Sequence, residues 1–124
     1  MKRWLGLLLL LVFVLSGCEQ KVINKPDAFL KNLDVKILQK EFKDHPMWRD
    51  YTVIITNHEG KRVDVDKITL KMDMRTMSHP VEDQLERVSV GKYHVRNKEI
   101  LMAGRWYSEF KLYHDQHVLK IVKE

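Results

Sequence analysis

Apolar and polar side chains alternate along most of the chain beyond residue 33. In the segment 51–56, Tyr51, Val53 and Ile55 fall on one face, while Thr52 and Thr56 fall on the other. A period of two is typical of a β-strand with one buried face. Similar alternation or apolar runs occupy residues 33–38, 68–74, 106–112 and 118–122, and we expect one further short strand within 81–90. No stretch keeps a helical period over three turns.

Turn-forming residues separate these runs. The segment Asn57-His58-Glu59-Gly60-Lys61 should close a hairpin, with Gly60 free to take a positive φ. His114-Asp115-Gln116 should join the last two strands. Short strands with a turn about every ten residues predict an all-β domain, an antiparallel β-sandwich over residues 33–124.

The first 17 residues have a different pattern. Lys2 and Arg3 form a short positive region, and residues 5–15 are almost entirely apolar. This run is shorter than the roughly 20 residues of a membrane-spanning helix, so we interpret residues 1–17 as a signal peptide. The ending Leu15-Ser16-Gly17-Cys18 resembles the bacterial lipobox, which implies that Cys18 is lipidated and becomes the first mature residue. The alternative is a plain secretory signal followed by a cysteine by chance.

Cys18 is the only cysteine in the chain. The mature domain therefore forms no internal disulfide and offers no thiolate for catalysis or zinc binding. Acyl chains on Cys18 would hold the domain to the lipid bilayer on the extracytoplasmic face of the cell membrane. Residues 18–32 are polar and lack a sustained period, so we assign them to the lipidated N-terminus and a tether. A short helical turn is expected from Asp27 to Leu33, with Asp27 as its cap.

Charge excludes one class of partner. Without Lys2 and Arg3 the mature chain has 20 basic and 17 acidic side chains, a net charge of +3 with neutral histidines. Both signs are interspersed, which is too weak a signal for nucleic-acid binding. The sequence also has no phosphate loop and no pattern that pairs a nucleophile with a base. We therefore expect a protein that is not an enzyme and that binds no nucleic acid.

Soft donor side chains gather in one short segment. Met72, Met74, Met77 and His79 fall within eight residues, and Met102 could add another sulfur from a neighbouring strand. Thioether sulfur with imidazole suits Cu(I) outside the cell. The alternative is that these side chains pack the core, since methionine is a common core filler. Met72 fits that alternative best, because it continues the buried face of the strand at 68–74.

An ordered set of motifs resembles the YtkA-like domain family. The motifs are Tyr51-Thr52-Val53-Ile54-Ile55, Gly60-Lys61, residues 68–74 leading into Met77-Ser78-His79, Gly91-Lys92-Tyr93, and Met102-Ala103-Gly104-Arg105-Trp106. The resemblance covers about residues 33–122. It implies a membrane-anchored, immunoglobulin-like β-sandwich of about seven strands, related to the FixH proteins that are tied to copper-oxidase assembly.

The resemblance and the soft donors together suggest a function. We expect a lipoprotein that binds Cu(I) through Met74, Met77 and His79, or that assists copper delivery to a membrane oxidase or another copper-handling partner. The alternative is an immunoglobulin-like interaction module without metal. One departure from the family pattern counts against a metal: Arg75 places a positive charge beside the expected cation site.

Overall fold

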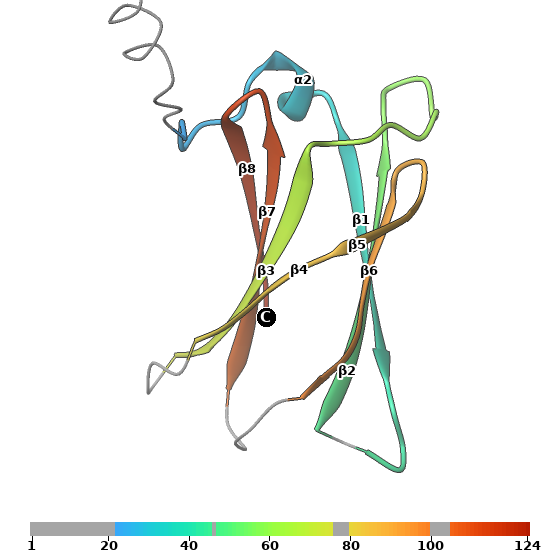
Figure 1. Ribbon diagram of the computed structural model, residues 1–124, viewed down its shortest axis with the longest axis vertical. Helices are drawn as coiled ribbons and strands as arrows, with labels where there is room; N and C mark the ends of the chain where they lie inside the picture. The colour runs from blue at the N-terminus through green and yellow to red at the C-terminus, as the bar shows by residue number, and fades with distance from the viewer. Residues whose placement is uncertain (1–21, 46, 76–79, 100–104) are drawn as a thin grey trace, which may run out of the picture.

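Two antiparallel sheets pack face to face in the computed structural model, which describes residues 22–45, 47–75, 80–99 and 105–124 (Figure 1). The first sheet has the order β1-β2-β6-β5, formed by β1 (Asp34–Glu41), β2 (Trp48–Thr56), β6 (Lys92–Glu99) and β5 (Glu86–Ser89). The second has the order β4-β3-β7-β8, formed by β4 (Val81–Gln84), β3 (Lys67–Met74), β7 (Trp106–His114) and β8 (His117–Lys123). The predicted antiparallel β-sandwich is confirmed, with eight strands where about seven were expected.

The core lies between the sheets and follows the predicted alternation. Tyr51, Val53 and Ile55 of β2 are buried against residues of the second sheet such as Phe110. The rings of Tyr51 and Phe110 meet edge to face, with centroids 5.5 Å apart. The Tyr51 hydroxyl lies 3.0 Å from the Ser108 hydroxyl, so the polar end of the buried tyrosine is satisfied across the two layers.

Two connections differ from the expected ones. Asn57 and Lys61 do form a turn, and Gly60 has a φ of +77° as predicted. The chain pairs with itself across this turn through the antiparallel Thr56–Arg62 bridge, so the predicted hairpin is present but short. It does not join β2 to β3, because these strands belong to different sheets. The single strand expected within 81–90 is two strands, because the chain crosses from the second sheet to the first at the buried Leu85. The turn at Asp115 and Gln116 joins β7 to β8 as expected.

A short helix, α2 (Ala28–Lys31), precedes the first strand. Asp27 is its N-cap, as predicted, and the Asp27 carboxylate accepts the Leu30 N–H at 2.9 Å. The Leu30 side chain is fully buried in the core. The part of the predicted tether that the structure describes therefore contacts the sandwich. Among the described residues, no helix is long and apolar enough to cross a membrane.

The sandwich has two distinct ends (Figure 1). We call one the helix end; it holds α2 and the β7–β8 turn, and α2 contacts both of these strands. We call the other the methionine end. It holds the end of β3 at Met74 and the start of β7 at Trp106, which face each other in the antiparallel register.

One side of the sandwich is open, because β1 and β8 are the outer strands of their sheets. The Lys123 ammonium of β8 reaches across and donates to the Ile37 carbonyl of β1 at 3.2 Å. A lysine that points at an outer strand is one of the devices by which proteins occupy free backbone groups at a sheet edge.

Candidate functional site

The methionine end carries the one predicted metal ligand that the structure describes. Met74 is the last residue of β3 and is 8% exposed. Its backbone N–H donates to the carboxylate of Asp73, which is also buried. Cys18, Met77 and His79, as well as Met102, lie outside the described residues. The structure therefore locates the start of the predicted donor segment.

Met72 and Met74 differ in their surroundings although both are buried. Met72 is 2% exposed and belongs to the cluster of contacting core side chains, as expected for plain core packing. Met74 lies outside that cluster as the described residues define it. Packing within this core accounts for Met72 but does not by itself account for Met74.

The register between β3 and β7 places the residues before Met77 and His79 beside the residues after Met102. Met74 pairs with Trp106, and the next backbone pair continues this contact, since the Arg75 N–H donates to the Arg105 carbonyl at 3.3 Å. Arg75 precedes Met77 and His79 in sequence, and Arg105 follows Met102.

The Arg75 guanidinium has its own partners. It lies over the Tyr107 ring, 4.6 Å from the centroid, and it pairs with the Glu124 carboxylate. A cation over an aromatic face and beside a carboxylate has part of its charge compensated. Arg75 is thus a weaker obstacle to a neighbouring cation than the sequence suggested.

A second group of polar side chains lies at the helix end. His114 Nδ1 is 2.7 Å from Asp27 Oδ2, and His114 Nε2 is 3.9 Å from Asp115 Oδ2. The Phe29 ring stacks on the His114 ring with a centroid distance of 4.0 Å. One ligand atom from each of Asp27, His114 and Asp115 lies within 4.8 Å of the others, which is close enough for a metal ion.

The two main partners shift each other's protonation. The hydrogen bond to Asp27 raises the pKa of His114 above its ordinary value, and this outweighs the opposing effect of burial. Burial raises the pKa of Asp27, but the hydrogen bonds to His114 and from the Leu30 N–H outweigh it, so the net pKa lies below the ordinary value. Both shifts favour the ion pair.

The Asp27 carboxylate is already used within the protein. Asp27 caps α2 through Oδ1 and pairs with His114 through Oδ2, so both of its oxygens are engaged, while the Asp115 side chain is exposed and its backbone N–H donates to the Asp66 carboxylate. We therefore assign the group a structural role, which is to hold α2 on the β7–β8 turn. The sequence placed His114 beside the turn between the last two strands and indicated no partner for it. Asp27 and His114 are 87 residues apart, so no local pattern could reveal their pairing.

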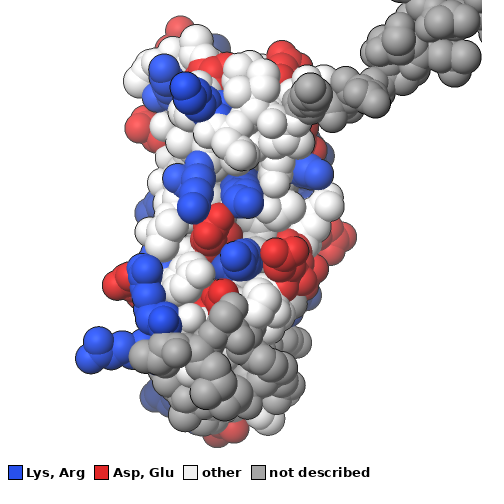
Figure 2. Space-filling view, turned by 90° about the vertical axis from the view of Figure 1, so that its left-hand side faces the viewer, with Lys and Arg blue, Asp and Glu red and all other residues white. Residues whose placement is uncertain are grey.

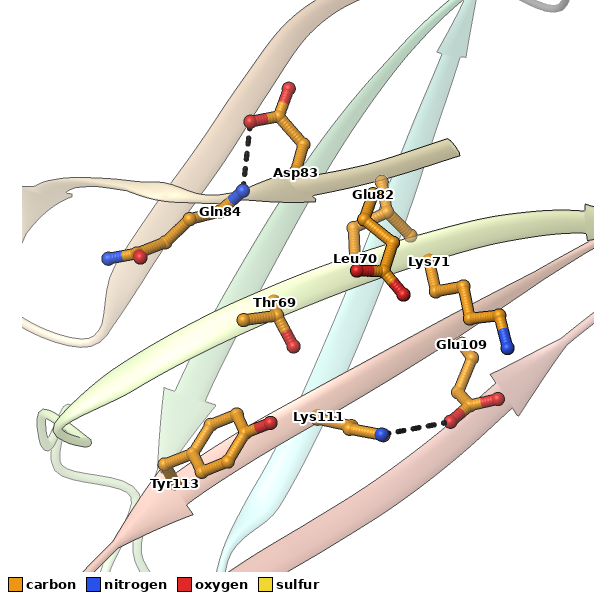
Figure 3. A pocket seen from close by; sticks show the side chains of 9 residues that line it. All are labelled: Thr69, Leu70, Lys71, Glu82, Asp83, Gln84, Glu109, Lys111 and Tyr113. Carbon is orange, nitrogen blue, oxygen red and sulfur yellow. Dashed lines mark hydrogen bonds and ion pairs between the residues drawn. The ribbon is translucent and has the colours of Figure 1, made fainter. Parts of the chain in front are cut away.

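The outer face of the second sheet carries a shallow trough. Lys and Arg side chains alternate with Asp and Glu over this side of the molecule (Figure 2). The trough has a volume of about 300 Å³ and is lined by Thr69, Lys71, Glu82, Glu109 and Lys111, among others (Figure 3). Glu109 is 8% exposed, with the Lys111 ammonium at 3.7 Å. The charged groups of the trough are neighbours on adjacent strands, so its charges compensate one another and indicate no particular ligand.

Comparison with protein families, with curated proteins and with solved structures finds no match to this chain. The structure therefore assigns this chain to a fold class and not to a family. The fold is an antiparallel β-sandwich with a short N-terminal helix.

Proposed function

We propose that this protein is a lipid-anchored extracytoplasmic β-sandwich that binds Cu(I) or assists its delivery to a membrane oxidase. In this proposal Cys18 carries the lipid, and Met74, Met77 and His79 supply the metal ligands. Two thioethers and one imidazole form a neutral, soft donor set that suits Cu(I). The protein is not an enzyme in this proposal, and its second partner is the lipid bilayer.

The observation that carries the metal proposal is the position of Met74. This thioether is buried at a strand end, outside the cluster of core side chains that the described residues form. The contact between Arg75 and Arg105 brings the flank of Met77 and His79 beside the flank of Met102. Arg75 and Arg105, which flank the two segments that carry the predicted donors, thus lie side by side at one end of the sandwich.

One observation favours the alternative, an immunoglobulin-like interaction module without metal. A methionine that is 8% exposed can also be held by packing alone. The strand order agrees with the immunoglobulin-like fold that both the proposal and the alternative expect. If β4 is set aside and the other strands are lettered A to G in chain order, the sheets read A-B-E-D and C-F-G. That is the order of immunoglobulin constant domains.

The metal proposal is tested by titrating the chain from residue 19 onward with Cu(I) against a competing chelator. The double variant Met77→Leu with His79→Ala should lose the affinity, because two of three ligands are removed. Met72→Leu is the matched control and should keep it, since Met72 is core. Cu(I) should bind more tightly than Zn(II), and binding should weaken as protons compete for His79.

The anchor is tested separately in cells. Cys18→Ser should abolish incorporation of labelled fatty acid and leave the precursor uncleaved or mislocalised. Normal labelling of that variant would end the lipoprotein proposal. Absence of Cu(I) binding by the unmodified domain would end the metal proposal and leave the interaction module.

A further inference from the structure

The chain is fixed to the sandwich from Ile23 onward. The Ile23 N–H donates to the Gln116 carbonyl at 2.7 Å, and Ile23 forms a parallel bridge with His117 at the start of β8. Two residues later the Val118 N–H donates to the Lys25 carbonyl at 3.2 Å. These backbone bonds attach the segment to the β7–β8 turn at the helix end.

Side chains complete this attachment. Asp27 pairs with His114, Phe29 stacks on the same imidazole, and Leu30 is fully buried in the core. Asn32 Oδ1 lies 3.2 Å from His58 Nε2 in the loop after β2. We call residues 23–33 the connector. Because it is held by backbone bonds, an ion pair and core packing, it should move with the sandwich as one body.

The connector limits the distance between the sandwich and a lipid on Cys18. Five residue steps separate Cys18 from Ile23, and a fully extended chain covers at most about 18 Å in five steps. Strand β7 has nine residues and runs from the methionine end to the helix end, which is about 27 Å. We call residues 18–22 the spacer. Its greatest possible length is thus shorter than that of β7, and it joins the sandwich at the helix end.

The side chains at the end of the spacer and just after it suit a lipid surface. Val22 and Ile23 are 58% and 43% exposed, which is high for large apolar residues; Lys25, two residues further on, and Lys31 of α2 are exposed as well. Apolar side chains with nearby lysines fit the boundary between acyl chains and anionic headgroups. The broad face of the second sheet mixes both signs of charge, which gives no comparable reason for it to lie on a membrane (Figure 2).

We propose that the helix end rests on the lipid headgroups and that the methionine end points away from the bilayer. The inference rests on the proposed lipidation of Cys18. It also sets the kind of partner: a protein that meets the methionine end must offer its surface roughly 25–45 Å above the membrane, the sum of strand and spacer lengths. A soluble protein or a projecting domain fits this requirement, and the side of a transmembrane helix does not.

The test uses the full lipidated protein in vesicles of phosphatidylcholine and phosphatidylglycerol that contain a headgroup-attached quencher. Cys18 is blocked by its lipid, so a single new cysteine can carry a fluorophore. Gln116→Cys reports on the helix end and Lys43→Cys, in the β1–β2 turn, on the other end; both positions are exposed. The label at 116 should lose most of its emission, while the label at 43 should keep the emission it has in quencher-free vesicles.

Equal quenching of the two labels, or stronger quenching at 43, would overturn the proposed orientation. The connector is tested with His114→Gln, which removes the ion pair and the ring stack. In that variant the label at 43 should become quenched as the sandwich gains freedom to tilt, whereas Lys31→Ala on the same helix should change nothing. Circular dichroism shows whether the variant keeps its fold; if it is folded and quenching at 43 is unchanged, the role given to the Asp27–His114 pair in holding the connector is wrong.

Flotation of the vesicles separates this inference from the anchor proposal. Protein that fails to float lacks the lipid, which contradicts lipidation. The orientation is then measured on chain coupled through Cys18, its single thiol, to a maleimide lipid, with the fluorophore placed at 116 or 43 as a fluorescent non-natural amino acid instead of on a second cysteine.

Discussion

The helix end and the methionine end of the sandwich are organised in different ways. The helix end is closed by contacts between residues far apart in sequence, such as Asp27 with His114 and Ile23 with His117. At the methionine end the described residues are strand termini and the β1–β2 turn, and the buried Met74 lies beside Arg75, which is paired with Glu124. The contacts at the helix end hold the connector on the sandwich, while the methionine end is where the proposed ligand would bind.

The largest effect should come from the buried leucine of α2. Leu30→Ala removes a fully buried side chain and should lower the free energy of unfolding by about 2–5 kcal/mol, because a cavity remains. Met74→Leu at the methionine end nearly conserves volume and should cost less than about 1.5 kcal/mol. Urea unfolding of the chain from residue 19 onward measures both. A loss below that of Met74→Leu would contradict the stabilising role of the helix end.

Two glycines with positive φ should differ in how much an added Cβ lowers the free energy of unfolding. At Gly91, with φ +66°, a Cβ would lie 2.6 Å from the Ile55 carbonyl oxygen and 2.9 Å from the Arg62 Cβ. Gly91→Ala should therefore cost about 2–4 kcal/mol from backbone strain and collision together. Gly60, with φ +77°, has no neighbour within 4 Å, so Gly60→Ala should cost only about 1 kcal/mol. Similar costs in thermal unfolding would mean that the backbone at Gly91 can shift.

The ion pair at the helix end predicts a pH dependence. His114 has a raised pKa, so its contribution is complete below the ordinary value of 6.5 and is lost as pH rises through the raised value. Asp27 has a lowered pKa, so its contribution is complete above 3.8 and is lost as pH falls through the lowered value. The pair therefore stabilises most between these two ordinary values.

Asp27→Asn keeps an oxygen that can cap α2 but removes the charge. We expect a cost of up to about 1 kcal/mol near pH 5 that shrinks above pH 7, because the pair is partly exposed. Denaturant unfolding across this pH range, with the exposed Asp115→Asn as the control, measures the effect. NMR titration should show the pKa of His114 falling in the variant. A pH-independent cost would show that Asp27 acts only as a cap.

The smallest effect should come from the outer face of the second sheet, which belongs to neither end. Glu109 lies 3.7 Å from the Lys111 ammonium and 3.6 Å from that of Lys120, both long for ion pairs. Glu109→Gln should cost less than about 1 kcal/mol, and the cost should decrease in high salt. A larger, salt-independent loss in urea unfolding would give this face a role in stability equal to that of the helix end.

The parts of the fold that depend on neighbours in sequence could be predicted from the sequence. The alternation of Tyr51, Val53 and Ile55 gave the buried face of β2, and Asp27 was identified as a helix cap from its own surroundings. The crossing at Leu85 could not be predicted, because one buried leucine between two short polar strands looks like part of a single strand. The same holds for the turn at Gly60, whose local bonds are those of a hairpin although its flanking strands separate into two sheets.

The candidate sites differ in the same way: one could be predicted from neighbours in sequence, and the other could not. Met74 could be proposed because its segment is locally rich in soft donors, and its place at a strand end agrees with the alternation of β3. The pairing of Asp27 with His114 depends on how the connector folds back over β7, and no spacing in the sequence encodes it. Cys18, Met77 and His79 stay predictions from sequence.

Lys123, which spans the open side of the sandwich, bears on how two copies of this chain can pair. A neighbour that tried to extend the first sheet by pairing with β1 would have to displace the Lys123 ammonium from the Ile37 carbonyl and leave that charge without its acceptor. Lys123 should therefore disfavour pairing of β1 with the strand of a second copy.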